Sequence, residues 1–153
     1  MNTKVPFSVE DAVDQPISLY AATKRANELM AHAYAHLYRL PITGLRFFTV
    51  YGPWGRPDMA PFKFTKAILE GQPIEIYNAG DMSRDFTYID DIIDGILRIQ
   101  HYPPPYADES DATREGAPAR LFNIGRGVPV RLLDFVDCIE AATGVKAIRQ
   151  MKP

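Results

Sequence analysis

Apolar residues recur at helical spacing in several stretches of the chain, each with a start or stop signal beside it. The longest stretch runs from residue 18 to about residue 38 and predicts a helix with one apolar stripe, formed by Leu29, Ala33, Leu37 and Leu40. A second helix is expected to begin at Pro61 and to stop before Gly71. Two more are expected, one after the acidic pair at residues 90–91 and one at residues 132–142.

Short apolar runs between these helices predict strands at residues 42–48, 74–77 and 121–124. Strands that alternate with helices favour an α/β fold with parallel pairing. Residues 103–118 contain prolines and charges without an aliphatic core residue, so we expect a mobile loop there.

Composition narrows the functional classes. A chain of 153 residues with 46% hydrophobic and 24% charged residues is long enough for one core. Its net charge of -2 offers no electrostatic footprint for nucleic acid or an anionic membrane. No apolar run is long enough to span a bilayer and no hydrophobic segment opens the chain, so we expect a cytoplasmic protein. Cys138 is the only cysteine, which excludes an internal disulfide and suits a small apolar position.

Tyr20 and Lys24 carry the first candidate chemistry. Residues four apart on a helix share a face, so the ammonium of Lys24 can lie beside the phenol of Tyr20. A fixed positive charge favours the phenolate and lowers the pKa of a tyrosine towards a range useful for proton abstraction. Enzymes that move a hydride to a nicotinamide need such a base. The alternative is an ordinary exposed Tyr and Lys on a helix.

Two further motifs follow in order. Residues 46–53 read Arg-Phe-Phe-Thr-Val-Tyr-Gly-Pro, and residues 84–91 read Arg-Asp-Phe-Thr-Tyr-Ile-Asp-Asp. With Tyr-x-x-x-Lys before them, they resemble the extended short-chain dehydrogenase/reductase family of nucleotide-sugar epimerases and dehydratases. The resemblance is strongest to UDP-glucuronate 4-epimerases, in which residues 19–24 and 49–60 look typical.

The resemblance implies a cofactor and a catalytic pair. It assigns Tyr20 and Lys24 to catalysis, and it assigns Tyr20, Lys24 and Phe47 to the binding of NAD. It also implies a homo-oligomer, because in this family the helix that bears the Tyr packs against its counterpart in a second subunit.

The resemblance further implies a UDP-sugar substrate bound by Thr49, Arg56, Tyr77 and Arg84. Thr49 stands where related enzymes usually carry Asn, and its smaller hydroxyl suits a C6 carboxylate; the alternative is a β-branched residue that ends a strand. Arg56 is assigned to the diphosphate or ribose, or is an exposed loop arginine. Arg84 is assigned to the diphosphate, or forms a salt bridge with Asp85. Tyr77 belongs to the uracil pocket or to the core.

One family feature is missing. Such enzymes begin with a strand, a Gly-x-x-Gly-x-x-Gly turn and a helix that binds the cofactor pyrophosphate. The tightly spaced pair Gly125 and Gly127 predicts a turn rather than a phosphate cradle, and the Ser/Thr that precedes the Tyr in the family is also absent. We therefore expect an α/β chain without the N-terminal cofactor half: the C-terminal part of a Rossmann-like parallel sheet plus a smaller nucleotide-sugar-binding region. Residues 1–55 are expected to be the Rossmann remnant, and residues 56–153 the substrate-binding region with its loop at 103–118.

Metal binding is the weaker interpretation of two polar clusters. Asp90, Asp91 and Asp94 suit the positive end of a helix, and His32 with His36 lacks a third ligand at metal spacing. The function that the resemblance implies is inversion of C4 of UDP-glucuronate to UDP-galacturonate through a 4-keto sugar, with no activity expected from this segment alone. The alternatives are a sibling 4,6-dehydratase or another 4-epimerase, and a noncatalytic sugar-nucleotide-binding or assembly module.

Overall fold

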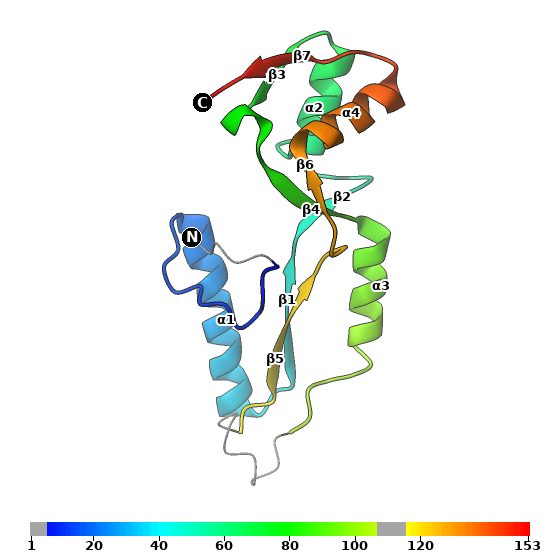
Figure 1. Ribbon diagram of the computed structural model, residues 1–153. Helices are drawn as coiled ribbons and strands as arrows, with labels where there is room; N and C mark the ends of the chain where they lie inside the picture. Colours follow the sequence, from blue (N-terminus) through cyan, green and yellow to red (C-terminus); the bar gives the residue numbers. More distant parts are fainter. Residues whose placement is uncertain (1–5, 107–115) are drawn as a thin grey trace. The chain divides into compact units, whose positions relative to one another are not determined.

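The computed structural model describes residues 6–106 and 116–153 (Figure 1). The chain divides into two compact units, each assembled from two segments. The first unit comprises Met1–Arg46 with Gly95–Ile124, and the second comprises Phe47–Asp94 with Gly125–Pro153. Most of the loop expected at 103–118 lies outside the described residues.

The first unit is a helix beside a strand pair. Helix α1 (Leu19–Tyr38) begins at Ser18, whose hydroxyl accepts a hydrogen bond from the Ala21 amide at 3.1 Å. Such a cap stabilises a helix start by about 1 kcal/mol. The helix ends at Arg39, which adopts the left-handed conformation with φ 53°. Strand β1 (Ile42–Phe47) pairs with β5 (Ala119–Ile124), and Figure 1 shows α1 alongside them.

The apolar stripe expected on α1 is exposed in this chain. Leu29 is 57% exposed and Leu37 is 68% exposed, while Ala35 is the residue of α1 that is fully buried. A small side chain at the contact allows the helix backbone to approach the strands closely. The larger apolar residues of α1 are therefore available for other contacts.

The second unit contains two strand systems. Strand β2 (Thr49–Tyr51) pairs in parallel with β4 (Ser83–Tyr88), and β4 pairs in antiparallel fashion with β6 (Pro129–Arg131). Strand β3 (Pro73–Ile76) pairs in parallel with β7 (Ile148–Met151). The expected α/β fold with parallel strands is therefore confirmed, although β4, β6 and β7 were not anticipated.

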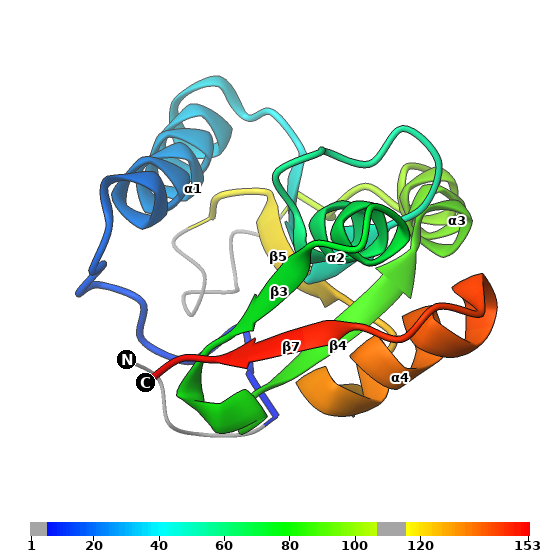
Figure 2. The same cartoon turned by 90° about the horizontal axis from the view of Figure 1, so that it is seen from above.

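Helices α2 (Ala60–Leu69) and α4 (Leu132–Thr143) pack beside the β3–β7 pair, as Figure 2 shows. Their apolar faces meet strand β3 in the core of the second unit, which consists of Ile68, Ile74, Ile76, Leu132, Val136 and Ile139. A short 3-10 turn η1 (Asn78–Gly80) leads from β3 towards β4. Helix α3 (Ile89–Ile99) begins in the second unit and ends in the first.

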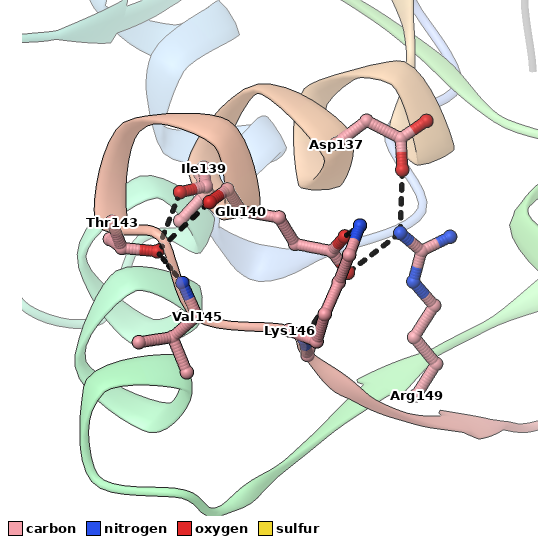
Figure 3. Close-up of polar contacts among 8 residues, drawn as sticks. Asp137, Ile139, Glu140, Thr143, Val145, Lys146 and Arg149 are labelled. Carbon is pink, nitrogen blue, oxygen red and sulfur yellow. Dashed lines mark hydrogen bonds and ion pairs between the residues drawn. The ribbon is translucent and has the colours of Figure 1, made fainter.

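A buried carboxylate joins α4 to β7 (Figure 3). The Glu140 side chain is 4% exposed and accepts hydrogen bonds from Lys146 Nζ at 2.5 Å and Arg149 Nη2 at 2.8 Å. The Ala147 amide donates a further bond to it at 3.1 Å. Arg149 also pairs with Asp137 on α4 at 2.5 Å. A buried charge needs such partners, and these four contacts fix the turn that brings β7 alongside β3.

Candidate functional site

Tyr20 and Lys24 lie one turn apart on the N-terminal half of α1. The Lys24 ammonium sits 5.3 Å from the centroid of the Tyr20 ring, within the range of a cation–π contact. Tyr20 is 66% exposed, so a ligand can reach its hydroxyl. The structure therefore places these two side chains together as the helical spacing predicts.

Phe47, the third residue assigned to the cofactor, is the last residue of β1. Its ring is 48% exposed. It belongs to the second unit, whereas Tyr20 and Lys24 belong to the first. Its role in holding a cofactor stays a prediction.

An open cavity of about 690 Å³ lies entirely within the second unit. Its volume falls within the usual range for small-molecule sites. The residues that line it include Thr49, Tyr77 and Arg84, three of the four expected substrate-binding residues. They come from the start of β2, the residue directly after β3 and the start of β4. The fold therefore brings together side chains that are distant in the sequence.

Arg56, the fourth residue, does not line the cavity itself but binds a residue that does. Its guanidinium binds Asp58 with two bonds, Nε to Oδ1 at 3.0 Å and Nη2 to Oδ2 at 2.5 Å, and Asp58 lines the cavity. The hydrogen bond from Arg56 holds the pKa of Asp58 below its usual value. Both side chains are more than half exposed, so the pair can exchange partners at little cost.

Tyr77 is held by a neighbouring carboxylate. Its hydroxyl donates a hydrogen bond to Glu75 Oε2 at 2.9 Å, and this bond raises the pKa of Tyr77 above its ordinary value. Lys152 lies 3.6 Å from the other carboxylate oxygen of Glu75. The Tyr77 residue is 53% exposed, which favours the pocket interpretation over a core aromatic.

Arg84 does not pair with Asp85 in the described part of the chain. The Asp85 carboxylate accepts hydrogen bonds from the backbone amides of Arg126 at 2.9 Å and Gly127 at 2.7 Å. Arg84 donates to the Ser83 carbonyl at 3.3 Å and lines the cavity. The same bonds occupy the amides of the expected Gly125–Gly127 turn, so a carboxylate of the chain fills the place that a phosphate would need.

Lys63 is a cavity residue that sequence reasoning missed. It lies on the first turn of α2, where the structure places no acid, and it lines the cavity with Arg84. Lys63 takes part in no ion pair among residues 6–106 and 116–153. A cation at the positive end of a helix is unusual, because acids are the residues that this end stabilises. This unusual position is the sequence feature that could have identified Lys63 as a candidate site residue.

The residues considered as metal ligands lie on the described helices α1 and α3. Asp90 and Asp91 lie in the first turn of α3, where they stabilise the helix dipole. His32 and His36 lie on α1 and are exposed. Within the described ranges there is no group of three or more His, Cys, Asp or Glu side chains that could hold a metal ion.

Comparison with known proteins defines the family. The model of the NAD dependent epimerase/dehydratase family matches residues 2–107, and the chain belongs to this family. A probable UDP-glucuronate 4-epimerase of Rhizobium meliloti is 54% identical over 158 residues, which cover 99% of this chain and 46% of that protein. UDP-glucuronate 4-epimerase 1 of Arabidopsis thaliana is 54% identical over 152 residues, which cover 97% of this chain and 35% of that protein.

Solved structures with a similar fold come from the same kind of enzyme. The UDP-glucuronic acid 4-epimerase from Bacillus cereus, solved in complex with UDP-glucuronic acid and NAD, aligns with a TM-score of 0.78 and 34% identity. The match covers 97% of this chain and 44% of that one. The chain thus spans less than half the length of these relatives and corresponds to part of a Rossmann-like domain with its neighbouring region. None of the described helices is both long and apolar enough to cross a membrane.

Proposed function

We propose that this chain forms the substrate-binding part, with the catalytic Tyr–Lys pair, of an NAD-dependent UDP-glucuronate 4-epimerase. The observation that carries the proposal is the cavity of the second unit, which gathers Thr49, Tyr77 and Arg84. In this proposal residues 1–55 supply the catalytic pair of the Rossmann domain and Thr49, and residues 56–153 supply the other residues that bind the nucleotide sugar. The relatives at 54% identity support this choice of substrate.

The charges of the cavity suit a diphosphate. Its two carboxylates are already paired, Asp58 with Arg56 and Glu75 with Lys152. Lys63 and Arg84, which form no ion pair among the described residues, supply positive charge for a diphosphate. The N-terminus of α2 adds to it, because Met59 and Ala60 line the cavity and no side chain caps this end.

The remaining parts of the ligand have partners of matching chemistry. The exposed ring of Tyr77 offers a stacking surface for uracil. Thr49 has a hydroxyl that can donate one hydrogen bond to the C6 carboxylate of the sugar. Arg56, freed from Asp58, can reach the ribose or a phosphate.

The chain also offers residues for the cofactor. The ammonium of Lys24 can bind the ribose of NAD, and Phe47, which is exposed, is the further cofactor-binding residue of this proposal. When bound, NAD supplies reversible hydride transfer at C4 of the sugar. The phenolic oxygen of Tyr20 would accept the proton of the sugar 4-hydroxyl and later return it. Lys24, whose ammonium lies 5.3 Å from the centroid of the Tyr20 ring, would help to hold that group in place. Return of the hydride to the opposite face of the 4-keto sugar, together with the proton from Tyr20, would complete the inversion.

The test is a turnover assay on the full-length protein that contains this chain. We expect UDP-glucuronate with NAD to give UDP-galacturonate, identified by nuclear magnetic resonance, and we expect no product from the 153-residue segment alone. Formation of a 4-keto-6-deoxy sugar from a nucleotide-linked glucose would identify a dehydratase instead. Binding of UDP without turnover of either substrate would identify a noncatalytic binding module and overturn the proposal.

A further inference from the structure

A chain of four charges ties α1 to β1 in the first unit. Arg25 on α1 binds Asp14 at 2.9 Å and Glu28 at 3.0 Å. Glu28 also accepts two hydrogen bonds from Arg46 on β1. One runs from Nε to Oε1 at 2.7 Å and the other from Nη2 to Oε2 at 2.9 Å. Glu28 and Arg46 side chains are each 23% exposed, so water screens this contact less than a surface ion pair.

Glu28 shares the face of α1 that carries Tyr20 and Lys24. Successive residues of an α-helix turn by about 100°, so positions 20, 24, 28 and 35 fall within an arc of about 80°. Ala35, which lies within this arc between the directions of Lys24 and Glu28, is the fully buried residue of the helix. The face of the catalytic pair is therefore continuous with the face that packs against the unit.

The inner side of α1 presents small side chains, the buried Ala35 and the half-buried Ala21 and Ala31, which constrain rotation of the helix about its axis only weakly. A methyl side chain is nearly symmetric around its contact, whereas a two-pronged bond between guanidinium and carboxylate has a fixed direction. The Arg46–Glu28 bond therefore sets the rotation of α1 relative to β1. Rotation of the helix moves every side chain on the same face, including Tyr20 and Lys24.

The charge states of the two partners agree with a persistent bond. Hydrogen bonding from Arg46 is the largest influence on Glu28 and holds its pKa below the usual value, against the opposing effect of burial. The bond to Glu28 raises the pKa of Arg46 above its usual value. Both groups are thus ionised across the neutral pH range.

We propose that Glu28 is a positioning residue, which aims the Tyr20–Lys24 pair by fixing the rotation of α1 through Arg46. The inference rests on the proposed function, because the pair must be catalytic for its aim to matter. A nucleotide-bound nicotinamide and a sugar hydroxyl both need Tyr20 and Lys24 in one orientation, and a small misplacement of reacting groups costs rate rather than affinity for the sugar.

The test compares Glu28→Gln with the parent in the full-length protein. Gln keeps the shape of the side chain but removes the charge that holds the Arg46 fork. We expect kcat to fall about tenfold while KM for UDP-glucuronate changes by less than about twofold. We also expect weaker NAD binding by titration calorimetry, because Lys24 loses its alignment with the cofactor ribose. Arg46→Lys, which keeps the charge and loses the fork, should show the same pattern with a smaller loss of thermal stability.

Glu70→Gln is the matched control, since Glu70, at the C-terminal end of α2, forms an exposed ion pair with Lys66 at 3.9 Å. It should leave kcat, KM and NAD affinity unchanged. A lowered Tm with unchanged kcat and NAD affinity in Glu28→Gln and Arg46→Lys would show a purely structural bond and overturn the inference. Inactivity of the parent protein, or full activity of Tyr20→Phe, would instead overturn the proposed function.

Discussion

At the scale of single residues, the Tyr20 hydroxyl is the group on which the proposed chemistry depends. Tyr20→Phe removes the proton acceptor and almost no volume. Because Tyr20 is exposed, the substitution breaks no buried hydrogen bond that would stabilise the fold. We expect kcat of the full-length protein to fall by about 10²–10⁴-fold with little change in KM for UDP-glucuronate. Steady-state kinetics on the purified variant measures both constants. Unchanged turnover would remove Tyr20 from its proposed role.

Lys63 allows a test of the cavity that does not depend on turnover. Lys63→Met keeps the length of the side chain and removes one of the two cations that line the cavity. We expect the dissociation constant for UDP to rise about tenfold or more, and its dependence on salt to weaken, as for the loss of a charge-assisted hydrogen bond. Calorimetric titration with UDP provides the measurement.

Lys66→Met is the control for that variant. Lys66 lies on the same helix, outside the cavity, and pairs with Glu70. Equal affinities of the two variants for UDP would show that the cavity is not the diphosphate site.

At the scale of helices and strands, the sequence predicts the elements that carry a clear period. The expected helix at 18–38 corresponds to α1, and the run at 42–48 contains β1. Strand β7 could not be predicted, because all its residues are exposed and it forms only by pairing with β3. Strand β6 has three residues and begins with Pro129, so no alternation is visible in it.

The Glu140 contacts predict a pH-dependent stability of the α4–β7 connection. Hydrogen bonds from Lys146 and Arg149 lower the pKa of Glu140 from 4.5 to about 2, so the native state favours the carboxylate. The stabilisation is complete above the ordinary pKa and is lost as the pH falls through about 2. Thermal unfolding followed by circular dichroism should show Tm falling in this acid range, and falling less steeply in Glu140→Gln.

The same substitution should lower Tm at neutral pH, because Gln leaves Lys146 and Arg149 without their buried carboxylate. Glu70→Gln, on an exposed pair, should keep the pH dependence of the parent. Identical slopes of Tm against pH in the parent and in Glu140→Gln would contradict this prediction.

At the scale of the whole molecule, the candidate site is only partly visible in the sequence. Thr49 and Arg84 were found through motifs and Tyr77 through the family resemblance, and the fold places the three around one cavity. Lys63 and Asp58 escaped notice, because their place in the cavity depends on how α2 packs against β3. Motifs identify residues that act on a ligand directly, whereas residues that join them through tertiary packing become visible only in the structure.

The apolar surface of α1 leads to a prediction about association. Large apolar residues are exposed along this helix, including Leu29, Met30, Tyr34 and Leu37. In the described part of the chain β1 pairs with β5 alone, which leaves one of its edges available. Exposed apolar area of this kind favours a self-complementary contact between two copies. We therefore expect the 153-residue chain to form dimers or larger species at micromolar concentration, measured by analytical ultracentrifugation.

A positive charge introduced on the proposed contact surface of α1 should prevent that association. In Leu29→Lys and Leu37→Lys the substituted side chains are exposed in the single chain, so the fold is retained, but pairing two copies would bury the added ammonium groups. We expect these variants to sediment as monomers, and Leu97→Lys, on an exposed position of α3, to associate like the parent. A parent chain that sediments only as a compact 17.2 kDa monomer would exclude α1 as a contact surface. Association that survives both α1 substitutions would instead assign the contact to the free edge of β1.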